Sequence, residues 1–239
     1  MNGQKASKRI LLLKTGGTIA PIKHGYGDFE DWFAQFMDVP DFLQVDVFRQ
    51  QSLPGPENLA GVVITGSAAM VSDKESWSER TAAWLEQAIQ HGIPVLGVCY
   101  GHQLLAHALG GCVGANPSGR QIGTVKVRLT DSASNDPLFE HLPPTFAAQA
   151  SHQEVVLELP PGARRLASSP LDGNFAIQFA DKVWGVQFHP EFSAPVMSEY
   201  IRYRRENLDE EGLNPDQLLS KVADTPEARS VLKKFKELL

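Results

Sequence analysis

One cysteine of this chain lies in a pattern typical of a catalytic nucleophile. Cys99 follows the apolar residues 94–98 and stands between Gly97 and Gly101, where a segment with helical spacing begins. Small residues on both sides of a nucleophile are typical of a sharp strand-to-helix turn that exposes the side chain. At a helix N-terminus the macrodipole favours a thiolate, and the next backbone N–H, that of Tyr100, is free to donate to an oxyanion. The pattern predicts a cysteine nucleophile.

A histidine and a carboxylate two residues apart are the candidate base and its partner. His189 ends the apolar run 183–188, and Glu191 follows after Pro190. In extended backbone, residues i and i+2 point to the same face, so both side chains can project together. Pro190 disfavours helical backbone at His189, which defines the end of the strand. A carboxylate beside an imidazole sets its tautomer and stabilises the imidazolium, so we predict a Cys99–His189–Glu191 triad.

The elements that must position these residues follow an alternating pattern up to Gly111. Strands are predicted at residues 10–13, 45–48, 61–64 and 94–98, and helices at 28–37, 75–90 and 101–109. Strand–helix alternation of this kind predicts a parallel sheet with helices on both faces. Ligand sites in such sheets lie at the carboxyl ends of the strands.

Beyond Gly111 the elements become shorter and the sheet is expected to turn antiparallel or mixed. Strands are predicted at residues 125–129, 154–159, 165–167, 175–179 and 183–188, all completing one sheet. From Pro195 onward the pattern is helical and charged, with breaks at 210–214 and 224–226 and a terminal helix at 227–239. We predict a three-layer α/β sandwich with an open, mostly parallel sheet. The predicted domains are a catalytic domain, residues 1–200, and a C-terminal helical extension, residues 201–239, packed on it.

Composition excludes several classes of function. The 239 residues include 42% hydrophobic residues, enough for a sizeable core, and their formal charge of −6 argues against a nucleic-acid partner. No apolar run reaches the length of a membrane span, and the first residues lack the features of a signal peptide. Two cysteines, Cys99 and Cys112, fit a reducing compartment. We therefore expect a cytoplasmic protein, and we predict neither a metal ion nor a cofactor.

The two motifs together resemble a known family. Gly97-Val98-Cys99-Tyr100-Gly101, followed about ninety residues later by His189-Pro190-Glu191, is similar to the class I (triad) glutamine amidotransferases, particularly the amidotransferase domain of GMP synthase. The resemblance covers roughly residues 8–200 and implies their flavodoxin-like fold. It also implies that Cys99 attacks the glutamine side-chain carbonyl and that a γ-glutamyl thioester is hydrolysed to glutamate, with release of ammonia.

The resemblance implies roles for further residues. Gly66 and Ser67 follow the third predicted strand, where the family has its oxyanion loop, and are expected to donate backbone N–H groups beside that of Tyr100. Gln103 matches the glutamine-binding position, and Ser151 and His152 match a polar loop that lines the pocket. Two residues are given structural interpretations instead: His102 as an exposed helix residue and Cys112 as a small core residue.

Other functions remain to be weighed. No phosphate loop of SGG-x-DS or Walker type occurs, so any acceptor enzyme or synthetase is expected on a separate subunit. Residues 14–20 resemble the nucleophilic threonine loop of bacterial-type asparaginases, but no H-G-T-D-T-like segment follows. The chaperone or deglycase branch generally lacks His-Pro-Glu. A γ-glutamyl peptidase uses the same triad and stays an open alternative, as does a catalytically silent binding protein of the same fold.

Overall fold

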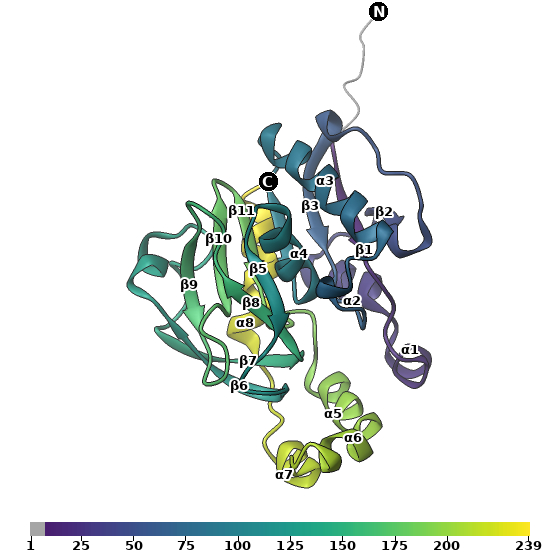
Figure 1. Ribbon diagram of the computed structural model, residues 1–239, viewed down its shortest axis with the longest axis vertical. Coiled ribbons are helices and arrows are strands. Elements are labelled where there is room, and N and C mark those ends of the chain that lie inside the picture. The colour runs from purple at the N-terminus through teal and green to yellow at the C-terminus, as the bar shows by residue number, and fades with distance from the viewer. Residues whose placement is uncertain (1–7) are drawn as a thin grey trace, which may run out of the picture.

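The computed structural model describes residues 8–239, and its central element is a nine-stranded sheet (Figure 1). The strand order is β2-β1-β3-β4-β11-β10-β9-β6-β7. The strands are β1 Arg9–Lys14, β2 Leu43–Asp46, β3 Leu59–Ile64, β4 Val95–Val98, β6 Gln121–Leu129, β7 Thr145–His152, β9 Arg164–Ser168, β10 Ala176–Ala180 and β11 Val183–Val186. A separate two-stranded ribbon consists of β5 Cys112–Ala115 and β8 Glu154–Glu158.

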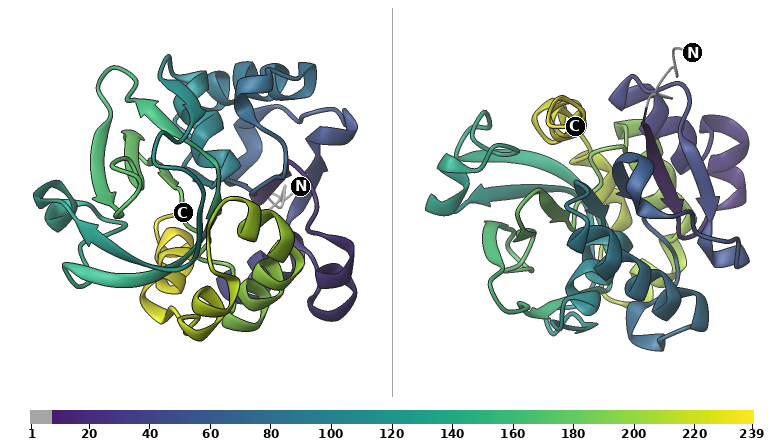
Figure 2. Two further views of the ribbon diagram at one scale, coloured as in Figure 1. Left: turned by 60° about the horizontal axis from the view of Figure 1, so that its bottom comes forward. Right: turned by 90° about the horizontal axis from the view of Figure 1, so that it is seen from above.

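Helices cover both faces of the main sheet. They are α1 Ala20–Tyr26, α2 Phe29–Met37, α3 Ser76–Gln90, α4 Tyr100–Ala108, α5 Ala194–Tyr203, α6 Arg205–Glu210, α7 Pro215–Ser220 and α8 Pro226–Glu237. Figure 2 shows the sheet between α3 and α4 (teal) on one side and α8 (yellow) on the other. The predicted class, a three-layer α/β sandwich with an open mixed sheet, is confirmed.

Two hydrophobic cores explain this layering. Alternate residues of β1 point to opposite faces, so Leu12 packs with Phe33 of α2 and Phe235 of α8 in one core, while Leu11 packs with Leu85 of α3 in the other. All five side chains are fully buried. Both faces of the central strands are therefore apolar, which is why these strands appear in the sequence as continuous apolar runs.

The parallel half of the sheet brings three strand ends together. β4 pairs in parallel with β3 on one side and with β11 on the other, with Gly97 opposite both Ile64 and Gly185. The loops that follow these three neighbouring strands therefore meet at one edge of the sheet. Cys99, the loop beginning at Thr65, and His189 all follow these strands.

Several predicted elements differ from those observed. The strand predicted at 45–48 is β2 at Leu43–Asp46, followed by a 3₁₀ turn at Val47–Arg49 whose apolar Val47 packs under α3. The strand predicted at 154–159, observed as β8, pairs with β5 outside the main sheet. β5, β7 and α1 were not predicted. The sequence of β7, Thr-Phe-Ala-Ala-Gln-Ala-Ser-His, is rich in alanine, which has low β propensity, and its strand conformation depends on pairing with β6 and packing under α8.

The C-terminal helices pack against the sheet and α2. Val231, Leu232 and Phe235 of α8 are fully buried in the same core as Trp184 of β11. The predicted breaks at 210–214 and 224–226 match the gaps between α6, α7 and α8. A domain boundary at residue 200 stays a prediction. Among residues 8–239, no helix combines the length and the apolar character that a membrane span requires.

Candidate active site

Cys99 lies at a strained turn between β4 and α4. Its backbone angles are φ 51° and ψ −101°, a conformation that a residue other than glycine rarely adopts. The flanking glycines make the turn sterically feasible. A Cβ atom on Gly97 would lie 2.4 Å from the carbonyl oxygen of Gly101, and one on Gly101 would lie 2.7 Å from the carbonyl oxygen of Ile64 in β3. The G-x-C-x-G pattern is therefore required by close backbone packing.

His189 and Glu191 form a buried pair after β11. Nδ1 of His189 lies 2.7 Å from Oε1 of Glu191, and the two residues are 3% and 0% exposed. The backbone N–H of His189 donates to the carbonyl of Gln149 at 2.8 Å, and its ring stacks on Phe192 with centroids 4.0 Å apart. Because Glu191 occupies Nδ1, the other ring nitrogen is left free within residues 8–239, and Cys99 is close enough to raise the pKa of His189. The structure thus brings the three predicted triad residues together.

The charge balance at His189 favours an imidazolium. Burial opposes a positive charge on this ring, but Glu191 and Cys99 outweigh burial and raise the pKa of His189 to about 10. An imidazolium beside a cysteine stabilises the thiolate, which is the nucleophilic form.

The loop after β3 is held against the histidine. A Cβ atom on Gly66 would lie 2.8 Å from Cε1 of His189, so this position needs a glycine. The hydroxyls of Thr15 and Thr65 donate to the Gly66 carbonyl at 2.9 and 3.0 Å, and the Ser67 hydroxyl donates to the Thr15 carbonyl at 2.9 Å. Neither the Gly66 nor the Ser67 N–H donates to another residue within 8–239. Both N–H groups are therefore available to a ligand.

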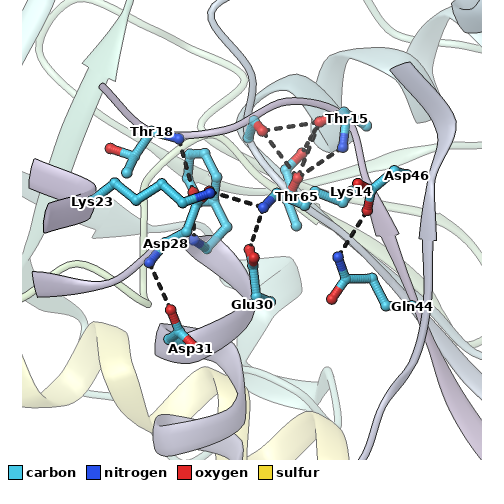
Figure 3. Close-up of polar contacts among 12 residues, drawn as sticks. Lys14, Thr15, Thr18, Lys23, Asp28, Glu30, Asp31, Gln44, Asp46 and Thr65 are labelled. Atoms are coloured by element: carbon cyan, nitrogen blue, oxygen red, sulfur yellow. Dashed lines mark hydrogen bonds and ion pairs between the residues drawn. The ribbon is translucent and has the colours of Figure 1, made fainter. Parts of the chain in front are cut away.

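These contacts also explain the Thr15-Gly16-Gly17-Thr18 segment. Thr15 is 1% exposed, and its hydroxyl contacts Thr65 and Gly66 (Figure 3). A buried hydroxyl engaged in this way braces the loop after β3. The geometry gives no support to an asparaginase-like threonine nucleophile at this position.

A buried ion-pair cluster stabilises the segment that follows β1. Lys14 Nζ lies 2.8 Å from Asp28 and 2.5 Å from Glu30, and Asp28 also accepts the N–H groups of Thr18 and Phe29 (Figure 3). The cluster ties the end of β1 to the start of α2. Phe29 itself stacks near His189, with ring centroids 6.4 Å apart.

A cavity of about 110 Å³ opens beside the thiol. Cys99, Gln103, Ser151 and His152 all line it, together with Ser67. Gln103 is oriented by two donated hydrogen bonds, to the Glu154 carbonyl at 2.7 Å and to Gln187 at 3.0 Å. The Ser151 carbonyl is 3.9 Å from Cys99 Sγ. Every residue predicted for the pocket therefore lines the same cavity.

His152 forms part of this wall as a neutral ring. Burial, reinforced by the charge of His189, lowers the pKa of His152 to about 3. Its two ring nitrogens have no hydrogen-bond partner among residues 8–239.

Two structural interpretations of individual residues were wrong. His102 was expected to be exposed, but it is fully buried because α4 lies directly on the sheet: a Cβ atom on Gly185 would lie 2.6 Å from its Nδ1. Burial lowers the pKa of His102 to about 3. Cys112 was expected in the core, but it is exposed, since it begins β5 in the outer ribbon.

Two arginines of the site were not predicted. Arg120 and Arg204 both line the cavity beside Cys99. Arg204 also lines a second cavity of about 40 Å³, whose walls include His189, Phe192 and Tyr200. Arg204 lies in the charged run Arg202-Tyr203-Arg204-Arg205-Glu206, which has the composition of a solvated helix face, so the sequence carries no signal for its role.

Comparisons with known proteins agree with this geometry. Residues 41–204 match the family model Glutamine amidotransferase class-I. A GMP synthase [glutamine-hydrolyzing] of Aeropyrum pernix is 38% identical over 150 residues, which are 63% of this chain and 26% of that protein. The chain therefore spans about a quarter of the length of the GMP synthases that it matches.

Two further matches extend over more of the chain. Gamma-glutamyl peptidase 5 of Arabidopsis thaliana is 28% identical over 201 residues, 81% of this chain and 80% of that protein. The crystal structure of a glutamine amidotransferase from Thermotoga maritima has a similar fold, with a TM-score of 0.74, 23% identity and 97% coverage of both chains. With the family model matching residues 41–204, well over half of its length, this chain belongs to the class I glutamine amidotransferase family.

Proposed function

We propose that this protein hydrolyses the side-chain amide of glutamine to glutamate and ammonia through a γ-glutamyl thioester on Cys99. One observation carries the proposal. Cys99 occupies a strained strand-to-helix turn close enough to His189 to raise the pKa of that ring, and Nδ1 of His189 is 2.7 Å from the buried Glu191. This is the arrangement of an activated nucleophile, a base and a residue that orients the base.

In the proposed reaction, the Cys99 thiolate attacks the amide carbon and a tetrahedral oxyanion forms. Its collapse breaks the C–N bond, and the His189 imidazolium gives its proton to the departing nitrogen, so ammonia leaves. His189 then takes a proton from water, which attacks the thioester carbon. The C–S bond breaks, glutamate is released, and the Cys99 thiolate beside the His189 imidazolium is restored.

Three backbone donors are proposed to stabilise the oxyanion. The first turn of α4 leaves the Tyr100 N–H without a helical partner, and it directly follows the nucleophile. The Gly66 and Ser67 N–H groups lie in the loop that contacts His189. Gln103, Ser151 and His152 are proposed to bind the glutamyl part of the substrate, because they line the cavity beside the sulfur.

A second candidate function is γ-glutamyl peptidase activity, which uses the same steps on an amide that carries an amino acid in place of ammonia. Arg204 favours it, because this cation lines the cavity next to His189, where a leaving group must receive its proton. The relative named gamma-glutamyl peptidase 5 also matches over 80% of its length.

Partners and compartment belong to the proposal as well. If ammonia is passed on, we infer that a synthetase subunit on another chain receives it, as the GMP synthase relatives suggest. The two cysteines, Cys99 and Cys112, are unpaired, which suits a reducing cytoplasm.

The proposal is tested by measuring glutamate release from glutamine and from γ-glutamyl dipeptides with purified protein. Cys99→Ala should abolish release, while Cys112→Ala, at the exposed cysteine of the outer ribbon, should retain it. Equal activity in wild type and Cys99→Ala would reject the thioester mechanism.

A further inference from the structure

Arg204 lies at the boundary between the two cavities of the site. It lines the cavity that contains Cys99 and the smaller one that contains His189. Its backbone N–H donates to the Tyr200 carbonyl at 3.2 Å, and its guanidinium carbon is 6.0 Å from the centre of the Tyr200 ring. The end of α5 therefore places a cation next to the reacting groups.

The two arginines of the site differ in how their charges are balanced. Arg120 donates two hydrogen bonds to Glu211, at 2.7 and 2.8 Å, so its charge is neutralised. Arg204 has no comparable partner, and its Nε atom is buried without an acceptor among residues 8–239. A half-buried guanidinium with unused donors is suited to bind a carboxylate through two parallel hydrogen bonds.

Glu154, the acidic residue that lines the larger cavity, does not supply that carboxylate. It already accepts the N–H groups of Val71 and Ser72, at 2.9 and 3.4 Å, and the Ser72 hydroxyl. Glu191, on the far side of His189, is engaged by that ring. Glu211 also attracts Arg204 electrostatically, but it forms no hydrogen bond with Arg204 and is engaged by Arg120, so the guanidinium donors of Arg204 are left for a ligand.

The position of His189 indicates which part of the substrate Arg204 meets. His189 must protonate the departing nitrogen, so the leaving group occupies the cavity that His189 lines. Ammonia from glutamine carries no group that a guanidinium recognises. A leaving amino acid carries a carboxylate near its nitrogen, and glycine is the smallest such leaving group.

We propose that Arg204 is a specificity-determining residue that binds a carboxylate on the leaving group, so that the site prefers γ-glutamyl amino acids and peptides to glutamine. This inference rests on the proposed Cys99 chemistry. The residue that ends α5 would then contribute to substrate specificity.

The test compares two substrates that differ in the carboxylate alone. γ-Glutamylglycine and γ-glutamylethylamide share the scissile amide and have leaving groups of similar size, but the ethylamide has a methyl group where the glycine has a carboxylate. Wild type should show at least a tenfold higher kcat/KM on γ-glutamylglycine. Arg204→Gln should lose that preference, because its kcat/KM should fall at least tenfold more on γ-glutamylglycine than on the ethylamide. Arg205→Gln is the matched control, because Arg205 pairs with Asp216 on the exposed side of α6.

If wild type hydrolyses both substrates at equal rates, the proposal is overturned without any variant. An equal loss on both substrates in Arg204→Gln would also overturn it, and would place the guanidinium on the α-carboxylate of the glutamyl group instead. Binding of both compounds to Cys99→Ala, measured by calorimetry, keeps the inference separate from the catalytic proposal. Tighter binding of γ-glutamylglycine supports the inference even if wild type hydrolyses neither compound, and that lack of hydrolysis would count only against the peptidase reaction. Absence of glutamate release from glutamine as well would reject the proposed function.

Discussion

Gly66 lies directly against the ring of His189: a Cβ atom at position 66 would be 2.8 Å from Cε1 of that ring. The carbonyl of Gly66 is meanwhile held by the hydroxyls of Thr15 and Thr65. The loop after β3 therefore has little freedom to retreat. Gly66 therefore has two roles: it leaves space for His189, the proposed base, and it places the proposed oxyanion donors of the loop.

Gly66→Ala should consequently reduce kcat. The added methyl group must push either His189 or the loop out of position, and loss of one oxyanion donor costs about 10²–10³ in rate. Gly173→Ala is the control, since no atom lies within 4 Å of a Cβ atom at that position. Steady-state kinetics on the best substrate measures the effect. Unchanged kcat in Gly66→Ala would exclude this loop from the reaction.

A glutamine-like diazo-ketone should label Cys99 and leave Cys112 unmodified. Solvent exposure alone would predict labelling of Cys112, because Cys112 is exposed at the start of β5 whereas Cys99 is only 6% exposed. The imidazolium next to Cys99 and the cavity beside it provide the selectivity. Peptide mapping by mass spectrometry identifies the labelled residue. Modification mainly at Cys112 would contradict the assignment of the nucleophile.

Glu191→Gln should move the alkaline limb of the kcat/KM profile to lower pH. Burial alone would lower the pKa of His189, but the charges of Glu191 and Cys99 outweigh burial and raise this pKa to about 10. Removing one opposite charge at this distance lowers such a pKa by about 1–3 units. His189→Ala should remove most turnover, while Glu191→Gln keeps part of it. A pH–rate profile identical to wild type would show that Glu191 does not act on His189.

The same pair predicts how stability depends on pH. The His189 pKa of about 10 in the folded chain exceeds the ordinary value of about 6.5 for an unfolded chain. The contribution of the charged ring to stability is therefore fully present below about pH 6.5 and is lost as pH rises toward 10. Urea unfolding across this range should show a decline in wild type that His189→Ala lacks. Parallel curves for the two proteins would contradict the raised pKa.

Lys14→Met should destabilise the fold far more than Lys23→Met. Both ammonium groups contact Asp28, but the Lys14 side chain is 5% exposed and that of Lys23 is 57% exposed. Loss of Lys14 leaves the buried carboxylate of Asp28 without its buried partner, which costs about 3–5 kcal/mol, whereas an exposed pair is worth less than about 1 kcal/mol. The free energy of unfolding in urea measures both. Similar losses in the two variants would show that burial does not control this cluster.

The sequence by itself determined the two catalytic motifs, because each consists of residues that are close together in the chain. Gly97 and Gly101 around Cys99 indicate a turn that closely packed backbone requires, and Pro190 between His189 and Glu191 indicates a strand end. In each motif the backbone conformation and the reactive side chain are encoded within five residues or fewer. The alternation of apolar strands and helices likewise predicted the parallel half of the sheet, because each strand buried on both faces is a continuous apolar run.

Tertiary structure alone decided which distant residues share a surface. The burial of His102 depends on α4 lying on Gly185 of β11, and the exposure of Cys112 depends on β5 pairing with β8 outside the main sheet. Arg204 follows Cys99 by more than a hundred residues, and its charged surroundings resemble a solvated helix. It reaches the site because α5 packs against α1 and β6 and ends beside the cavity that contains Cys99. Periodicity reports which face of an element is apolar, but pairing and packing partners depend on contacts between segments far apart in the chain, and these have no local signature.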